Sequence, residues 1–219
     1  MIALIRFRFA AFVRSHRVFQ PVLGVFVVLG LLYASGVPLG NELSSYADSA
    51  AILVPVFAWA ARGLLDNEPD EQRMIARAAV GRGEQAGGLV AAFACNLLLA
   101  AFALVWPLLT GFAALPGADV LLIGALLHLL SVIGGTVLGA LTSRPLLPSP
   151  AISLIALLGG YIGILVVGSG SVWVFPAMSW MRAANHGELT AHLPAIIASA
   201  TLWSLAGLAA YGWLRRTRP

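Results

Sequence analysis

Six long apolar stretches are the feature of this 219-residue sequence that most restricts its fold. A helix needs about 20 mainly apolar residues to cross the ~30 Å hydrocarbon core of a bilayer. The stretches that meet this length are residues 21–40, 45–65, 88–110, 119–141, 151–167 and 193–213. The composition agrees, because only 10% of the residues are charged, against about 25% in a soluble domain. We therefore expect an all-α membrane protein that forms one domain over residues 1–219.

The arginines indicate how these spans are oriented. If six spans leave both termini on one side of the membrane, twelve of the thirteen arginines fall on that side and only Arg182 falls on the other. Basic residues accumulate in cytoplasmic connections, so both termini are expected in the cytoplasm. The high pI of about 10.0 then reflects topology, and we expect no nucleic-acid partner. The expected location is the cytoplasmic (inner) membrane of a bacterial cell, with the chain crossing it several times.

The sequence contains no lysine, which excludes several kinds of chemistry. A phosphate-binding loop that ends in Gly-Lys-Ser/Thr is impossible, as is a catalytic or Schiff-base lysine. If the protein depends on ATP, another chain must bind it. The single cysteine, Cys95, excludes an intrachain disulfide and lies in an apolar stretch, where a small buried side chain is expected.

The first 20 residues predict an amphipathic helix. Apolar side chains recur at spacings of three and four, which places them on one helical face: Ile2, Ile5, Phe9, Phe12 and Val13. Arg14 lies opposite this face, and Arg6 and Arg17 lie on its flank. This pattern is typical of a helix in the membrane interface whose arginines reach lipid phosphates.

The longest cytoplasmic connection predicts a second amphipathic helix, over residues 66–81, of about 12 residues and roughly 18 Å. Asp66 and Asn67 are candidate caps, and Pro69 suits a first turn. Acidic residues come next, then basic ones, and glycines at 81 and 83 are expected stops. Met74, Ala78 and Gly81 line one face, with Ile75 and Ala79 beside it. Such a helix can present an apolar surface with a charged rim to a cytosolic protein; a loop that rests on lipid headgroups is the alternative.

Residues 168–192 predict a re-entrant outer segment before the sixth span. This stretch is too long for a turn and too apolar to be freely solvated, and Pro176 interrupts it. We expect one or two short helices that dip into the outer interface, with Trp173 and Trp180 at headgroup depth. Trp173 and Phe175 belong either to an aromatic belt or to an extracellular gate.

Polar residues inside the predicted spans are candidates for a substrate path, because they are costly at membrane depth. His128 and Asn96 are the main candidates, although for His128 a neutral side chain bonded to a neighbouring helix is favoured over a proton relay, because no deeply embedded carboxylate accompanies it. Small residues four apart predict close helix packing, within the bundle or across a dimer. They are Gly135, Gly139, Gly159 and Gly163.

The serines and histidines near the fifth and sixth spans are the only candidates for a catalytic or metal site. Ser169 or Ser171 with His192 would resemble the dyad of an intramembrane serine protease, but these serines lie in a glycine-rich exit from the fifth span. His186 and His192 lack a third ligand at suitable spacing for a metal. We therefore expect neither an enzyme nor a metal site.

This layout resembles the permease subunit of type-2 ATP-binding-cassette (ABC) exporters. The shared features are a basic N-terminal amphipathic helix, six spans, a cytosolic helix between spans two and three, and a re-entrant stretch before span six. Residues 61–81 are similar to that family's coupling-helix region. The short connection between spans one and two differs from members with large extracellular domains.

The resemblance implies a dimer of permeases, identical or paralogous, docked on two separate ABC ATPase subunits. This chain would bind no cofactor, and ATP and Mg would be held by the ATPase. The expected ATPase contacts are Asp70, Glu71, Arg73, Met74, Ile75 and Arg77. The substrate would be hydrophobic or amphipathic, since nothing charged lines a path through the spans. A substrate-binding membrane subunit of a vitamin importer is the main alternative; it would couple through small residues of the first span.

Overall fold

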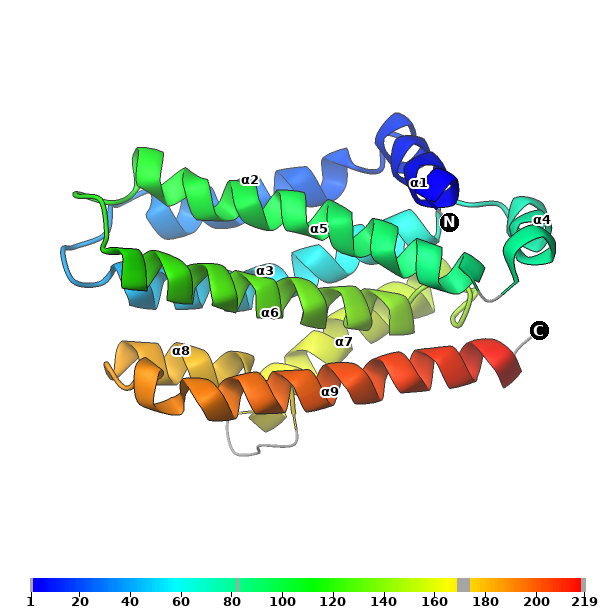
Figure 1. Cartoon of the computed structure of the whole chain (residues 1–219). Helices are drawn as coiled ribbons and strands as arrows, with labels where there is room; N and C mark the ends of the chain where they lie inside the picture. The colour runs from blue at the N-terminus through cyan, green and yellow to red at the C-terminus, as the bar shows by residue number, and fades with distance from the viewer. Residues whose placement is uncertain (1, 82, 169–173, 218–219) are drawn as a thin grey trace.

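The structure is a computed structural model that describes residues 2–81, 83–168 and 174–217. These residues form nine α-helices and no β-strand (Figure 1). The helices are α1 (Ile2–Arg14), α2 (Phe19–Tyr33), α3 (Glu42–Leu65), α4 (Asp70–Val80), α5 (Gly83–Thr110), α6 (Ala118–Leu141), α7 (Pro150–Gly168), α8 (Ala177–Asn185) and α9 (Leu189–Thr217). The all-α prediction is confirmed.

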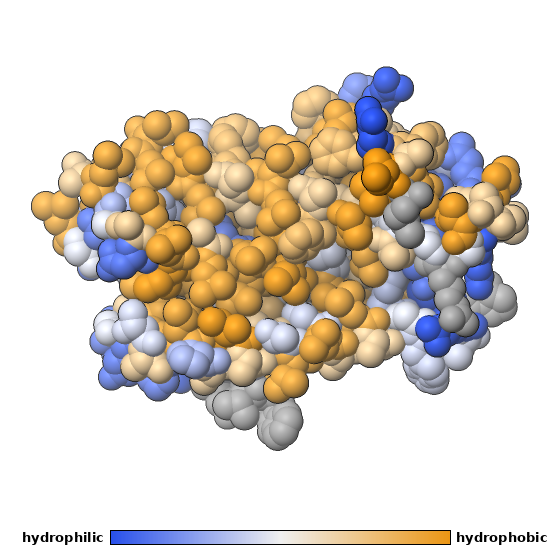
Figure 2. Space-filling model, viewed as in Figure 1, coloured by the Kyte–Doolittle hydropathy of each residue, from blue (hydrophilic) through white to orange (hydrophobic). Residues whose placement is uncertain are grey.

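Five of these helices are long and apolar enough to cross a membrane: α3, α5, α6, α7 and α9. A sixth span is counted if α1 and α2, which meet at a bend of 72°, are taken as one broken span. Figure 2 shows apolar side chains over the middle of the molecule and hydrophilic ones gathered toward its two ends. This distribution fits a multi-pass membrane protein.

The first predicted span differs from the structure. A continuous helix over residues 21–40 was expected, but α2 has 15 residues and ends at Tyr33. Gly36 adopts a positive φ of 71°, and Pro38 follows it two residues later. The connection folds back, and the Val37 backbone N–H donates to the Gly111 carbonyl at 2.8 Å. At 1.5 Å per residue, α2 alone reaches about 22 Å.

Helix α3 lies at the centre of the bundle and contacts α1, α2, α5, α6, α7 and α8. Its closest neighbour is α6, because glycines of α6 face small residues of α3. A Cβ atom added at Gly139 would lie 2.4 Å from the Ala58 carbonyl oxygen, and one at Gly135 would lie 2.6 Å from the Phe57 Cβ. Only glycine permits the two backbones to approach this closely.

Side chains from the surrounding helices donate hydrogen bonds to backbone carbonyls of α3. The pairs are Trp180 to Ala47, Ser131 to Ala50, Tyr161 to Ala51 and Asn96 to Phe57. One of these bonds compensates for a helix-interior proline: Pro55 has no N–H for the Ala51 carbonyl, which instead accepts the Tyr161 hydroxyl at 3.0 Å. The second predicted span is therefore regular in spite of Pro55.

The outer segment contains one short helix, α8, packed on α3, α7 and α9. Trp180 was expected at headgroup depth, but its side chain is fully buried and its indole N–H donates to the Ala47 carbonyl at 3.1 Å. Trp180 therefore faces the interior of the bundle, where its N–H has a buried acceptor and its ring has apolar contacts; its depth in a membrane stays a prediction. Trp173 lies outside the described residues.

One end of the bundle carries most of the charge. It comprises α1, α4, the C-terminal ends of α3 and α9, the N-terminal ends of α5 and α7, and the α1–α2 and α6–α7 connections, and we call it the charged end (Figure 1). Of the eleven arginines that the structure describes, ten belong to it, and Arg182 lies in α8. The start of α1 and the end of α9 therefore lie at the same end of the molecule.

If the bundle crosses a membrane, the charged end and the α5–α6 connection must face opposite sides. We expect a membrane-impermeant maleimide to label Ile75→Cys and Leu115→Cys from opposite sides of the bilayer, since both positions are exposed. Labelling is measured in intact and inverted vesicles. The native chain is the background control, because its one cysteine, Cys95, is buried. Labelling of both variants from the same side would contradict this arrangement.

Candidate functional site

Helix α4 is the most exposed element of the charged end. It joins α3 to α5, and none of its residues is buried. Met74 and Ile75 are 64% and 68% exposed, although apolar side chains of this size normally pack inside. The helix was predicted over residues 66–81 and is observed at Asp70–Val80.

The ends of α4 differ partly from the prediction. Asp66 does not cap α4; it terminates α3, and its carboxylate accepts the Arg144 backbone N–H at 2.6 Å. Gly81 ends α4 as expected, with a φ of +58° that favours glycine. Gly83, expected as a second stop, is the first residue of α5.

Polar contacts hold α4 against the rest of the charged end. Arg73 donates to the Asp70 carboxylate at 3.1 Å and to the Glu68 carbonyl at 3.0 Å. Asp70 also pairs with Arg144 from the α6–α7 connection, at 3.3 Å. Between α4 and that connection lies a groove of about 360 Å³, lined in part by Met74 and Arg77. Glu71 is exposed. The six residues predicted to contact an ATPase thus lie on one exposed helix.

Beneath α4 lies a buried charge network, which we call the buried quartet: Arg8, Glu68, Glu84 and Arg215. Arg8 of α1 pairs with both carboxylates, and its distance to the Glu84 Oε1 is 2.6 Å. Arg8 also donates to the Glu84 carbonyl at 2.7 Å. Arg215 of α9 pairs with the other oxygen of Glu84 at 2.9 Å. The quartet joins α1, the α3–α4 connection, α5 and α9, with two charges of each sign.

Glycine makes room for this network. A Cβ atom at Gly88 would lie 2.5 Å from a terminal nitrogen of Arg8 and 2.9 Å from Leu65. Arg8 therefore crosses the start of α5 in a space that no larger residue would leave open. From the sequence, these charges indicate only membrane topology. Glu84 lies 76 residues from Arg8 and 131 residues from Arg215, and nothing in the sequence shows that they pair.

The polar residues predicted for a substrate path bind other helices. His128 is fully buried; its Nδ1 lies 2.9 Å from the Gly124 carbonyl oxygen, and its Nε2 lies 3.4 Å from the Ser49 hydroxyl. A carbonyl oxygen can only accept, so Nδ1 carries the proton and donates it to Gly124, while Nε2 lies beside the Ser49 hydroxyl. Asn96 donates to the Phe57 carbonyl and to Thr136, both at 3.0 Å. Both side chains link α3 to its neighbours.

Phe175, predicted for a gate or an aromatic belt, is fully buried between α6, α8 and α9. Its ring makes edge contacts with Trp180 and Trp203 and fills the space beside Gly134, where a Cβ would lie 2.3 Å from the ring. Phe175 therefore fills the space between the outer segment and α6 as a core side chain.

The four predicted packing glycines fall into two pairs. Gly135 and Gly139 lie against the backbone of α3, as described above. A Cβ at Gly159 or Gly163 would meet nothing within 4 Å, so this side of α7 is open in the single chain.

The residues of the enzyme alternative are only partly described. Ser169 and Ser171 lie outside the described residues. His192 lies 3.6 Å from Glu188 at the start of α9, and both side chains are exposed. Among the described residues, no three His, Cys, Asp or Glu side chains are grouped so that they could hold a metal ion.

The buried quartet predicts a large stability effect at Glu84. Glu84→Gln leaves Arg215 without its carboxylate partner, and loss of one member of a buried ion pair costs about 3–5 kcal/mol. We expect a clear drop in the thermal unfolding midpoint of the protein in detergent. The matched control is Glu71→Gln on exposed α4, for which a change within about 0.5 kcal/mol is expected. Equal effects of the two substitutions would contradict a structural role of the quartet.

The two glycine pairs predict opposite effects of alanine. Gly139→Ala places a methyl group against the Ala58 carbonyl and should destabilise the protein by about 1–3 kcal/mol. Gly159→Ala adds a methyl group in open space, and the higher helix propensity of alanine should leave stability equal or up to ~1 kcal/mol higher. Thermal unfolding of the monomer in detergent measures both. A loss at Gly159 similar to that at Gly139 would contradict the packing described here.

Comparisons with models of protein families, with curated proteins and with solved structures found no match to this chain. Three features of the described residues bear on function: the exposed helix α4, the network that ties it to three other helices, and the apolar bundle behind it.

Proposed function

We propose that this chain is the permease subunit of a type-2 ABC exporter, which moves a hydrophobic or amphipathic substrate across the cytoplasmic membrane. The observation that carries the proposal is α4. It connects two helices that are suited to cross a membrane, has no buried residue, and exposes Met74 and Ile75. An apolar pair on an exposed helix suits a protein partner.

Within this proposal, the residues of α4 divide into two groups. Met74 and Ile75 make the apolar contact with an ATPase subunit, and Glu71 and Arg77 form its charged rim. Asp70 and Arg73 hold α4 in place through Arg144 and the Glu68 carbonyl.

The charged end offers a route by which movement of α4 would reach the spans. Arg73 bonds the backbone of Glu68, and the Glu68 side chain pairs with Arg8. Glu84 then connects Arg8 to Arg215 of α9. A displacement of α4 by the partner would therefore act on α1, α5 and α9 together, as well as on α3 through the short connection.

The proposed assembly contains two ATPase subunits, which hold ATP and Mg, and a second permease, identical or paralogous. The absence of lysine supports this division, since this chain cannot form a phosphate-binding loop of the Gly-Lys-Ser/Thr type.

Counting α1 and α2 as one broken span gives six spans, with both termini and α4 in the cytoplasm. The excess of arginine at the charged end supports this orientation.

The proposal is tested on the exposed pair. Met74→Asp/Ile75→Asp should abolish recovery of an ATPase with the chain when it is purified from its native membranes, because two carboxylates would have to be desolvated in the contact. The measurements are ATP hydrolysis in the purified material and the identity of the subunits recovered. The amount of chain in the membrane should not change, since neither position is buried.

The matched control is Leu39→Asp/Leu115→Asp. These leucines are 70% and 82% exposed in connections at the end opposite α4, so the same chemical change is made away from the proposed contact. Undiminished ATPase recovery with the α4 variant, or equal loss with the control, would contradict the proposed contact.

A further inference from the structure

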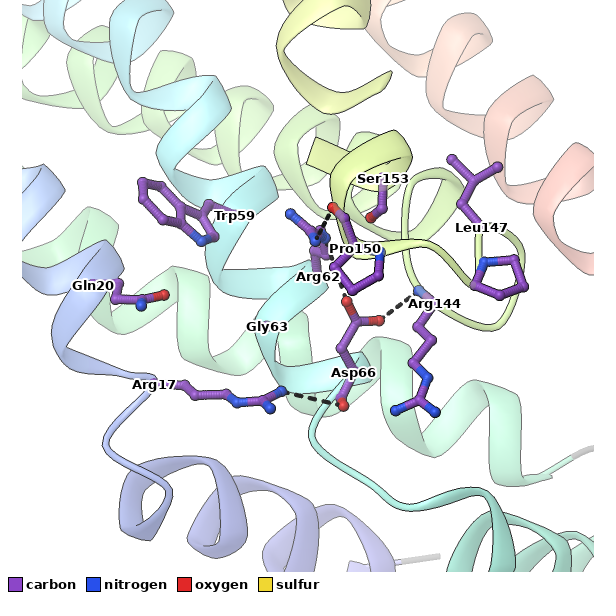
Figure 3. A pocket seen from close by; sticks show the side chains of 11 residues that line it. Arg17, Gln20, Trp59, Arg62, Gly63, Asp66, Arg144, Leu147, Pro150 and Ser153 are labelled. Carbon is purple, nitrogen blue, oxygen red and sulfur yellow. Dashed lines mark hydrogen bonds and ion pairs between the residues drawn. The ribbon is translucent and has the colours of Figure 1, made fainter. Parts of the chain in front are cut away.

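A pocket at the charged end has no role in the function proposed above. It has a volume of about 260 Å³ and lies between the start of α2, the end of α3, and the α6–α7 connection with the first turn of α7. Figure 3 shows Arg17, Arg62 and Arg144 arranged around Asp66. Arg144 reaches Asp66 through its backbone N–H, and its guanidinium pairs with Asp70 at 3.3 Å. Three guanidinium groups therefore face two carboxylates, which leaves an excess of one positive charge.

Asp66 and the backbone occupy only part of the donor capacity of these arginines. Arg62 contacts the Asp66 carboxylate at 3.3 Å and donates to the Pro150 carbonyl at 3.2 Å. Arg17 donates to the Asp66 carbonyl at 3.4 Å. Because each guanidinium carries five N–H groups in a planar fork, several donors stay available for a second anion.

The Asp66 carboxylate compensates this charge only partly. Burial raises its pKa above the usual value for aspartate, against the opposing effects of the Arg144 backbone N–H and the side chains of Arg62, Arg73 and Arg17. One Asp66 oxygen is already bonded to the Arg144 backbone N–H. An added anion would therefore meet positive charge in excess.

Apolar side chains of α2 and α3 lie at one edge of the pocket. Trp59 lines it and is 40% exposed, and every other residue of α3 is at least half-buried. On α2, Gln20 lines the pocket and Leu23, one turn further along, is exposed. Tryptophan beside arginine is typical of the depth at which lipid head groups lie.

We propose that this pocket binds a phosphate group, supplied by the head group of an anionic membrane lipid. Arginine forks match phosphate oxygens and form charge-assisted hydrogen bonds with them. The volume is below the ~300–1,000 Å³ of sites for drug-sized molecules, which suits a head group with its acyl chains outside, along Trp59. A free phosphate compound has the same chemistry but makes no use of the exposed apolar side chains of Trp59 and Leu23.

The test uses the purified chain in detergent with phosphatidylglycerol and phosphatidylcholine of identical acyl chains, counted by native mass spectrometry. We expect the native chain to retain phosphatidylglycerol in preference to phosphatidylcholine. Arg17→Gln/Arg144→Gln should weaken phosphatidylglycerol binding at least tenfold, since two charge-assisted contacts are lost. Arg62 is left intact because it also holds the start of α7.

Two further variants separate the pocket from general charge and from damage to the fold. Arg14→Gln/Arg216→Gln removes the same charge from exposed positions of the charged end outside the pocket and should leave binding unchanged. Asp66→Asn keeps an acceptor for the Arg144 N–H and removes the competing charge, so it should strengthen binding. A structural defect would weaken binding in both pocket variants.

Two results would overturn the proposal. Equal loss in the pocket variant and in the Arg14→Gln/Arg216→Gln control would show that the bulk charge of this end attracts the lipid. Tight binding of inorganic phosphate with no preference for phosphatidylglycerol would overturn the lipid as the source of the phosphate. Neither measurement involves an ATPase, so failure here is distinguishable from failure of the exporter proposal.

Discussion

The close contact between α3 and α6 is the interaction on which the rest of the bundle depends. In hydrocarbon there is no hydrophobic force between helices, so association depends on packing and on hydrogen bonds. Glycines of α6 let its backbone approach α3, and side chains of α5, α6, α7 and α8 bond to α3 carbonyls. Because α3 uses small side chains and its own backbone as contact surface, it can be surrounded by six other helices.

This arrangement leaves charge only at the ends, where it is used in two different ways. The buried quartet is balanced and closed, with two arginines paired with two carboxylates away from solvent. The pocket beside Asp66 is unbalanced and open, with three arginines set against the carboxylates of Asp66 and Asp70. A balanced buried network holds helices in a fixed arrangement, whereas an unbalanced exposed one attracts a partner of opposite charge.

The predictions from sequence succeeded where the signal is local and missed what only the assembled bundle creates. The exposed helix between the second and third predicted spans was predicted because acidic residues at its start are followed by basic residues within two helical turns. Gly81 marks its end. The early end of α2 was missed, because a run of apolar letters does not show that Gly36 turns back toward Gly111. The burial of Trp180 was missed because its acceptor, the Ala47 carbonyl, belongs to a helix 133 residues away. The quartet was missed for the same reason: charge type is visible in a sequence, but pairing across distant helices is not.

Arg144 belongs to both regions of the charged end. Its guanidinium pairs with Asp70 of α4, and it also lines the pocket beside Asp66. A phosphate that draws this guanidinium into the pocket would weaken the contact with Asp70 and loosen α4 from the α6–α7 connection. By linkage, a partner that holds α4 against Arg144 would disfavour phosphate binding by the same factor. If α4 receives an ATPase and the pocket receives a lipid, the two events are therefore coupled through one side chain, and Arg144→Gln would uncouple them.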